Sequence, residues 1–274
     1  MAGTSSHDVG PKWLPTWDGA LYAANTGHHR RYDARFLSTL PLAPTDRVLD
    51  LGCGAGDLTA TVAQLVPDGH VVGLEPQPSL LAEARGRAGA NQSFVETAAQ
   101  QLSEAIPGTD VFDVIFSQSV LHWIPRADHP GILRECRRLL RPGGVLRVEC
   151  GGGDNVREVV TFLDAIARDV AGPTAPCAPW TFVHAGTYLD LLLETGFDVQ
   201  DGFVHTVAQR RVFDRDSLLG WLASQATEAY ATDLAPEQRE PFRAQVAARV
   251  DELRRRDGSY DLTFVRLDLL ALNP

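Results

Sequence analysis

A glycine-rich turn at residues 52–56, Gly-Cys-Gly-Ala-Gly, is the most informative feature of the sequence. Glycines directly after a strand let the backbone approach a ligand closely, and the next helix presents free N–H groups there. Asp50 precedes the turn, and Asp57 stands where a dinucleotide fingerprint needs a third glycine. Two carboxylates would repel a pyrophosphate but attract a ligand that carries a sulfonium and an ammonium group. The turn therefore favours a cationic ligand over a nicotinamide dinucleotide.

Two further side chains could take part in chemistry beside this turn. Glu75 ends the next predicted strand, where a carboxylate can accept hydrogen bonds from both hydroxyls of a ribose. The alternative is a solvated acid at a strand end. His122 follows the fourth predicted strand, at the edge of the sheet where ligands bind. Its imidazole could remove a proton from a phenol, amine, amide or carbon acid, or it could only pack and form hydrogen bonds.

An alternation of strands and helices must position these residues. Apolar segments predict strands at 47–51, 70–75, 93–96, 112–117 and 145–150, with helices at 22–40, 58–65, 78–88 and 132–140. Strands that are apolar throughout are typical of buried parallel sheets. The sequence therefore predicts an α/β fold, a three-layer sandwich around a mostly parallel sheet. Farther along, helices are predicted at 155–170, 188–194, 214–230 and 236–256, and strands at 196–211 and 262–272.

The bulk composition excludes several classes of protein. The chain has 274 residues, 44% of them hydrophobic and 22% charged, which is typical of a soluble globular protein. A net charge of −10 disfavours a nucleic-acid partner. The four cysteines show neither a disulfide framework nor zinc-ligand spacing, so no metal is expected. No signal peptide or membrane-spanning segment is visible, which predicts a cytoplasmic protein without a membrane partner. The sequence does not indicate an oligomeric state.

In combination, residues 46–150 resemble the class I S-adenosylmethionine-dependent methyltransferases. The matching motifs lie at 48–56, 72–75, 112–115 and 139–144. Looser matches at 121–125, 188–197 and 264–267 resemble the small-molecule branch of trans-aconitate methyltransferase-like enzymes. The resemblance implies a seven-stranded, Rossmann-like sheet whose last strand is antiparallel. It also implies S-adenosylmethionine as cofactor and S-adenosylhomocysteine as product.

The resemblance assigns the cofactor to residues that follow the ends of the first four strands: Asp50, Gly52, Gly54, Gly56, Glu75, Pro76, Gln77, Ala98, Ala99 and Ser117. The glycines would approach the methionine part, and Asp50 would stabilise its ammonium group directly or through water. The Ser117 carbonyl would meet the same ammonium group. Glu75 would hold the ribose, with the two residues after it flanking the adenine.

The sequence departs from the family at the adenine. An acid after the third strand usually accepts a hydrogen bond from the adenine amino group, and Ala98 takes its place here. Either Ala98 and Ala99 contribute backbone contacts only, or Gln100 or Gln101 substitutes.

The acceptor is expected to meet a helical lid and an aromatic wall. Tyr22, His28 and His29 are the lid candidates, with an ordinary solvated helix surface as the alternative. Adjacent histidines do not face the same way on a helix, which argues against a two-histidine metal site. Trp180 could line the acceptor pocket or belong to a small satellite core. His122 is the candidate catalytic residue.

The sequence thus predicts three parts: an arm and lid helix at 1–44, a cofactor-binding core at 45–150, and residues 151–274, which complete the sheet and shape the acceptor pocket. The predicted reaction is in-line transfer of a methyl group to an O, N or C atom of a small molecule, with a role in biosynthesis. Two alternatives are a nicotinamide-dependent oxidoreductase, which Asp50 and Asp57 disfavour, and a non-catalytic S-adenosylmethionine-binding protein.

Overall fold

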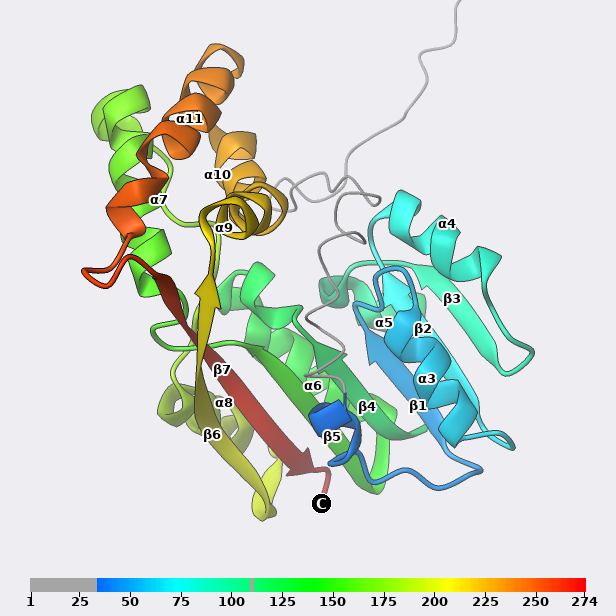
Figure 1. The fold of residues 1–274 in the computed structure, drawn as a ribbon. Helices are drawn as coiled ribbons and strands as arrows, with labels where there is room; N and C mark the ends of the chain where they lie inside the picture. Colours follow the sequence, from blue (N-terminus) through cyan, green and yellow to red (C-terminus); the bar gives the residue numbers. More distant parts are fainter. Residues whose placement is uncertain (1–33, 109–110) are drawn as a thin grey trace, which may run out of the picture.

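A seven-stranded sheet forms the centre of the chain in the computed structural model, which describes residues 34–108 and 111–274 (Figure 1). The strand order is β3-β2-β1-β4-β5-β7-β6. The strands are β1 (Arg47–Leu51), β2 (His70–Glu75), β3 (Gln92–Glu96), β4 (Phe112–Gln118), β5 (Leu140–Gly151), β6 (Asp198–Phe213) and β7 (Tyr260–Leu272). β7 runs antiparallel to both of its neighbours, β5 and β6, and all other neighbouring pairs of these strands are parallel. The predicted Rossmann-like sheet with an antiparallel last strand is confirmed.

Helices cover both faces of this sheet, as three layers require. One face carries α3 (Asp57–Leu65) and α4 (Pro78–Gly86), and the other carries α5 (Leu102–Ala105), α6 (His129–Leu139) and α8 (Ala185–Glu194) (Figure 1). Local sequence explains several helix ends. Pro78 occupies the first turn of α4, where its missing N–H costs nothing. No described helix is long and apolar enough to cross a membrane.

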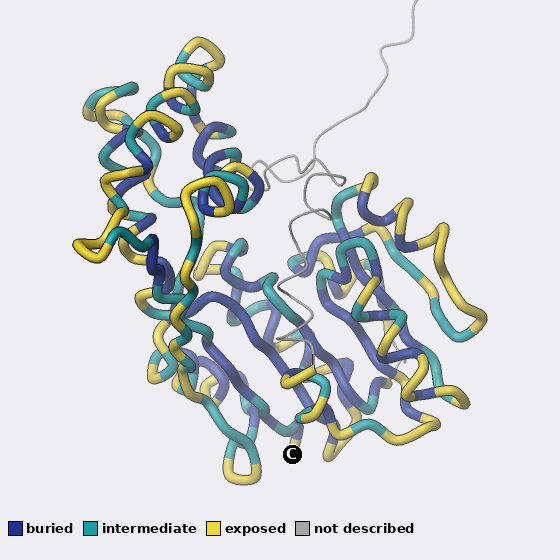
Figure 2. The backbone as a smooth tube through the Cα atoms, viewed as in Figure 1, coloured by how far each residue is buried: buried dark blue, intermediate teal, exposed yellow. Residues whose placement is uncertain are grey.

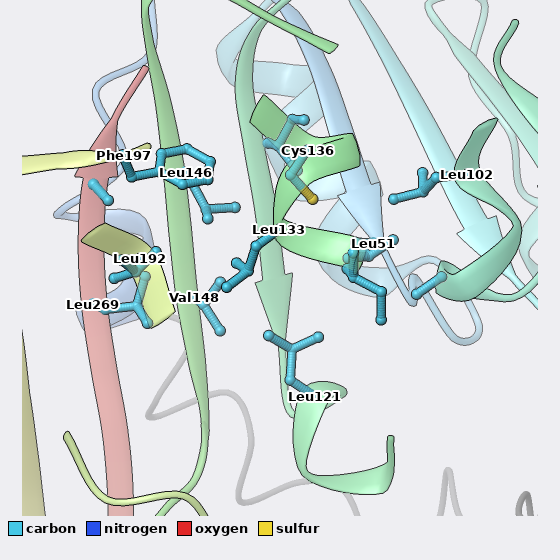
Figure 3. Packing of buried hydrophobic residues seen from close by; sticks show 14 of the residues in the cluster. Leu51, Leu102, Leu121, Leu133, Cys136, Leu146, Val148, Leu192, Phe197 and Leu269 are labelled. Carbon is cyan, nitrogen blue, oxygen red and sulfur yellow. The ribbon is translucent and has the colours of Figure 1, made fainter. Parts of the chain in front are cut away.

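The core divides between the two faces of the sheet. On the face of α6 and α8, Leu51, Leu133, Val148 and Leu269 belong to one buried cluster (Figure 3). On the other face, a smaller cluster joins residues of α3 to β1 and to Phe36. The five inner strands, β2, β1, β4, β5 and β7, are buried along most of their length, whereas the edge strands β3 and β6 are half-buried or exposed (Figure 2). Burial on both faces explains the continuously apolar sequences of β1, β2 and β4. The carboxyl ends of β1, β2 and β4 are thereby held in fixed relative positions.

A separate group of helices stands beyond the carboxyl edge of the sheet (Figure 1). It comprises α7 (Arg157–Ala171), α9 (Arg215–Leu222), α10 (Glu228–Asp233) and α11 (Pro236–Arg249). These helices enclose a hydrophobic cluster of their own, which includes Phe162, Trp221, Tyr230 and Phe242. Asp214 caps α9, because its carboxylate accepts a hydrogen bond from Ser217 N at 2.7 Å.

Several elements differ from the sequence predictions, and three of the differences change an element's type or start. The helix predicted at 214–230 is interrupted by a π-helix (Ala223–Thr227), and that predicted at 236–256 ends in a 3₁₀ turn (Val250–Leu253). Strand β5 begins at Leu140, because the chain leaves α6 directly into the pairing of Leu140 with Phe112. The division of the chain into three parts stays a prediction.

Candidate active site

A cavity opens where the loops after β1, β2, β3 and β4 meet. Its lining residues are Leu51, Gly52, Gly54, Leu74, Glu75, Pro76, Gln77, Leu80, Thr97, Ala99, Gln118, Ser119, Val120, Trp123 and Ile124. This is the carboxyl edge of the parallel strands, where open α/β sheets bind their ligands. Six of the residues predicted to bind the cofactor thus lie around one cavity: Gly52, Gly54, Glu75, Pro76, Gln77 and Ala99.

The glycine-rich turn is fixed by hydrogen bonds and by lack of space. Gly52 N and Cys53 N both donate to Leu74 O at 2.8 Å. Gly52 has φ +84°, and an added Cβ would lie 2.3 Å from a methyl group of Val120. Only glycine fits there. Gly56, with φ +82°, is the N-cap of α3 and does not line the cavity.

Glu75 is held in place by two backbone N–H groups. Its Oε2 accepts from Gly54 N at 3.0 Å and its Oε1 from Gln77 N at 2.9 Å. Burial raises the pKa of this carboxyl, and the two hydrogen bonds oppose that rise. Each carboxylate oxygen can accept a further hydrogen bond, and the residue lines the cavity. The geometry therefore prepares Glu75 to receive a pair of hydroxyl groups.

The two aspartates beside the turn lie outside the cavity lining. Asp50 is 2% exposed, and its Oδ2 accepts a hydrogen bond from Thr59 Oγ1 at 2.6 Å. Burial raises the pKa of Asp50 to about 7. Asp57 has a largely exposed side chain that forms an ion pair with Arg87 at 2.8 Å. The expectation that both acids face the ligand fails for Asp57, because its place on α3 turns it toward solvent, whereas Asp50 lies buried behind the cavity wall.

The adenine end of the predicted site has no acid from the third loop. Ala98 is buried and does not line the cavity, whereas Thr97 and Ala99 do. Gln100 directs its amide nitrogen to Asp128 Oδ2 at 3.1 Å. Neither Gln100 nor Gln101 lines the cavity. Of the residues named in the two alternatives, Ala99 therefore lines the cavity, and Ala98, Gln100 and Gln101 do not.

The end of β4 contributes residues that the sequence analysis did not select. Ser117 is fully buried and its hydroxyl donates to Leu51 O at 2.8 Å, so its side chain is not in the cavity. The residues just after it line the cavity instead: Gln118, Ser119, Val120, Trp123 and Ile124. Among the described residues, Gln118 Nε2 is buried without a hydrogen-bond partner. These residues could have been selected from their position alone, because they directly follow β4, a strand that pairs with β1.

His122 lies beside this cavity but not in its lining. Its Nδ1 accepts a hydrogen bond from Gly151 N at 3.2 Å. Its ring packs between Trp123 and Phe182, with centroid distances of 5.3 and 5.9 Å. The ring is 9% exposed.

Trp180 extends this aromatic group rather than lining the cavity. It stacks on Phe182 at 5.7 Å and meets the edge or face of Trp123 and Tyr230 at the same centroid distance. Since Trp123 lines the cavity, the aromatic group forms the wall behind it. The lid candidates Tyr22, His28 and His29 lie outside the described residues.

These residues fit S-adenosylmethionine. The cavity offers a prepared carboxylate for a ribose, apolar side chains for an adenine, and glycine peptides with room for close approach. The unpartnered Gln118 amide adds a donor for a carboxylate or hydroxyl. Two buried acids, Asp50 and Glu75, favour a cationic ligand over an anionic one.

Comparisons with known proteins agree with this site. Residues 48–144 match a family model described as "Methyltransferase domain". The trans-aconitate 2-methyltransferase of Methylobacterium nodulans is 30% identical over 271 residues, covering 94% of this chain and 98% of the relative. That of Escherichia coli is 27% identical over 261 residues, with the same coverage of each chain. This chain belongs to the class I S-adenosylmethionine-dependent methyltransferases.

Solved structures of other proteins share its fold. Phosphoethanolamine N-methyltransferase 2 of Haemonchus contortus, in complex with phosphomonomethylethanolamine and S-adenosylhomocysteine, gives a TM-score of 0.56 at 16% identity. The match covers 93% of this chain and 57% of that one. A cyclopropane synthase of Mycobacterium tuberculosis gives 0.55 at 18% identity, covering 88% and 83%. The methyltransferase described here uses S-adenosylmethionine as its cofactor, and nothing in the comparisons supports the oxidoreductase alternative.

Proposed function

We propose that this methyltransferase transfers a methyl group to a carboxylate oxygen of a small carboxylic acid. Relatives named trans-aconitate 2-methyltransferase match nearly the whole chain, including the helices beyond the sheet. Their name specifies a small acid that carries several carboxylates. A carboxylate is ionised at neutral pH, so such an acceptor needs no proton removed before it attacks.

The observation that carries this proposal is the hydrogen bond from Gly151 N–H to His122 Nδ1. An imidazole nitrogen that accepts from a backbone N–H carries no proton, so in neutral His122 the proton lies on Nε2. A base at Nε2 would need the opposite tautomer, which would set the Nδ1 proton against the Gly151 N–H. His122 is therefore arranged as a hydrogen-bond donor, which suits an acceptor that is already an anion.

The remaining residues would bind and orient rather than move protons. When bound, S-adenosylmethionine supplies an electrophilic methyl group on a sulfonium. Glu75 would hold the ribose, Pro76 and Gln77 would flank the adenine, and Gly52 and Gly54 would adjoin the methionine part. The aromatic wall of Trp123, Trp180 and Phe182 would exclude water from the reacting atoms. Alignment of acceptor and methyl group then accounts for the rate.

The test compares acceptors and follows their pH dependence. Purified protein is incubated with S-adenosylmethionine and a panel of di- and tricarboxylic acids, aryl carboxylic acids, phenols and amines, and S-adenosylhomocysteine is measured. We expect turnover with carboxylic acids and a base-labile methyl ester as product. Between pH 6 and 9 the kcat should not follow a single ionisation, because no base is needed.

His122→Asn provides the matching variant. An asparagine oxygen can accept from Gly151 N–H in place of Nδ1, while the imidazole is removed. A hydrogen-bond donor role predicts a loss of about tenfold in kcat/KM with an unchanged pH profile. Preferred methylation of a phenol or amine, with a pH dependence abolished in His122→Asn, would contradict the proposal. Tight binding of S-adenosylhomocysteine without turnover on any acceptor would instead favour the non-catalytic alternative.

A further inference from the structure

An arginine lies one hydrogen bond behind the wall of the cofactor cavity. Arg266 of β7 donates from Nη2 to Ser119 Oγ at 2.7 Å, and Ser119 lines the cavity. The Nε and Nη2 atoms of Arg266 also lie 3.1 Å from Glu149 Oε1 on β5. A positive charge from a distant part of the sequence is thereby fixed behind Ser119, outside the lining of the cavity.

The backbone of Ser119 is in an unusual conformation for a residue other than glycine. Its φ is +62°, and its N–H donates to Glu149 O at 2.7 Å. A left-handed conformation costs a non-glycine residue on the order of 1 kcal/mol or more, and such residues cluster at ligand sites. In this left-handed conformation the Ser119 hydroxyl accepts the hydrogen bond from Arg266 of β7. The position therefore has the character of a binding site.

The guanidinium of Arg266 has donors to spare. Its Nε and Nη2 serve Glu149 and Ser119, and no hydrogen bond between the described residues uses Nη1. The side chain is 15% exposed, whereas that of Glu149 is 4% exposed. Glu149 thus fixes the guanidinium from the buried side. Nη1 therefore keeps N–H donors from which a carboxylate could accept a charged hydrogen bond.

Arg266 and His122 flank the same residue. Arg266 pairs with Gly151 across β7 and β5, and Gly151 N donates to His122 Nδ1. His122 and the strand position of Arg266 therefore both adjoin Gly151 at the carboxyl end of β5. Asp268, which pairs with Glu149 in the register of β5 and β7, is engaged by Arg147 at 2.6 Å and by Arg35 at 3.1 Å, and so does not compete for Arg266.

We propose that Arg266, supported by Ser119 and Glu149, binds a carboxylate of the methyl acceptor. The inference rests on the proposed function, because it assumes a carboxylic acid as acceptor. It adds that affinity for the acceptor depends on one arginine of the last strand, while affinity for the cofactor does not. A purely structural ion pair, which would only tie β7 to β5, is the competing explanation.

The experiment measures binding as well as turnover in Arg266→Gln and Arg266→Lys. Trans-aconitate is titrated calorimetrically into protein saturated with S-adenosylhomocysteine, and its trimethyl ester serves as an uncharged probe. Arg141→Gln is the control, because Arg141 forms a more exposed ion pair with Asp113 at 2.5 Å near the starts of β5 and β4, at the opposite end of β5 from Glu149. Thermal denaturation of each variant reports the structural cost.

We expect Arg266→Gln to weaken trans-aconitate binding and raise its KM by about tenfold or more, the loss expected for charged hydrogen bonds. Arg266→Lys should recover part of the loss, and the affinity for S-adenosylhomocysteine should stay within about twofold. The ester should bind wild type and variant alike. Arg141→Gln should lower thermal stability without changing either affinity.

Two results would overturn the inference, and they differ in what else they overturn. If wild type methylates trans-aconitate or another acid of the panel and Arg266→Gln does so with unchanged KM, then Arg266 is structural and the proposed function stands. If wild type neither binds nor methylates any carboxylic acid, both proposals fall together. A parallel loss of acceptor and S-adenosylhomocysteine affinity in Arg266→Gln would also count against a specific role.

Discussion

Replacement of Glu75 by glutamine should separate the carboxylate's two tasks, which are to bind the cofactor ribose and to hold the glycine-rich turn. In the structure the carboxylate accepts hydrogen bonds from Gly54 N at 3.0 Å and from Gln77 N at 2.9 Å. Glutamine keeps one acceptor oxygen, so its NH₂ group must face one of these two N–H groups. A buried N–H without an acceptor costs about 1–3 kcal/mol, which should appear in the free energy of unfolding.

The cost to cofactor affinity is a separate quantity. The charged hydrogen bonds that Glu75 would make to a ribose diol contribute about 1.5–3 kcal/mol, or about 10- to 150-fold in Kd. Calorimetric titration of S-adenosylhomocysteine into folded Glu75→Gln measures this loss. Repeating it with 2′-deoxy-S-adenosylhomocysteine forms a cycle, in which a ribose contact predicts a much smaller effect of the substitution on the deoxy ligand.

Glu96→Gln is the matched control. Glu96 pairs with Glu75 in the register of β2 and β3, ends its strand in the same way, and is exposed. Its substitution should change stability and affinity by less than about 0.5 kcal/mol. An affinity of Glu75→Gln for S-adenosylhomocysteine within about twofold of wild type would refute the ribose placement. An equal loss for both ligands would assign the effect to the turn alone.

Three further outcomes follow from the geometry. Burial raises the pKa of Asp50 from 3.8 to about 7, so the folded state binds this proton more tightly than the unfolded state does. The contribution of protonated Asp50 to the free energy of unfolding is therefore complete below about pH 4 and is lost as the pH rises to about 7. Asp50→Asn, measured without ligand, should not show that loss, so its free energy of unfolding relative to wild type should rise by up to about 4 kcal/mol across this pH range in chemical denaturation. If the difference in unfolding free energy between variant and wild type does not change with pH, burial of Asp50 is not the cause. Gly52→Ala places a Cβ 2.3 Å from a valine methyl at φ +84° and should abolish measurable S-adenosylhomocysteine binding, whereas Gly86→Ala, whose Cβ meets nothing within 4 Å, should bind normally. Tyr230→Phe removes a hydrogen bond to Asp164 of 2.8 Å and should cost about 1 kcal/mol in unfolding free energy without affecting cofactor affinity; a loss of affinity would show that the helices beyond the sheet reach the cofactor.

Local patterns predicted the elements of the sheet well. Apolar runs marked β1, β2 and β4 to within a residue of their observed ends, because buried parallel strands must be apolar on both faces. The alternating segment that became β7 was also expected to be the antiparallel strand, from family resemblance. Helix interiors were less well defined, since nothing in the sequence near residue 225 indicated the π-helix.

The side-chain environment of each acid depended on tertiary contacts. Asp50 and Asp57 look alike in the sequence, on either side of the same turn. In the structure one is buried against Thr59 and the other is exposed beside Arg87, because one ends a central strand and the other begins a surface helix. The positions of the acidic residues in the sequence therefore predict an acidic site, but they do not show that Asp50 is buried and Asp57 is exposed.

The sequence by itself determined the order of strands and helices, the glycine-rich turn and the acid that ends β2, because these depend on residues close together in the chain. Only the tertiary structure decided which nitrogen of His122 carries the proton and what adjoins Ser119. Both depend on Gly151 and Arg266, which reach the site because β5 lies beside β4 and an antiparallel β7 lies beside β5. Strand pairing brings these distant segments into contact, and a pattern of neighbouring residues in the sequence does not show which strands pair.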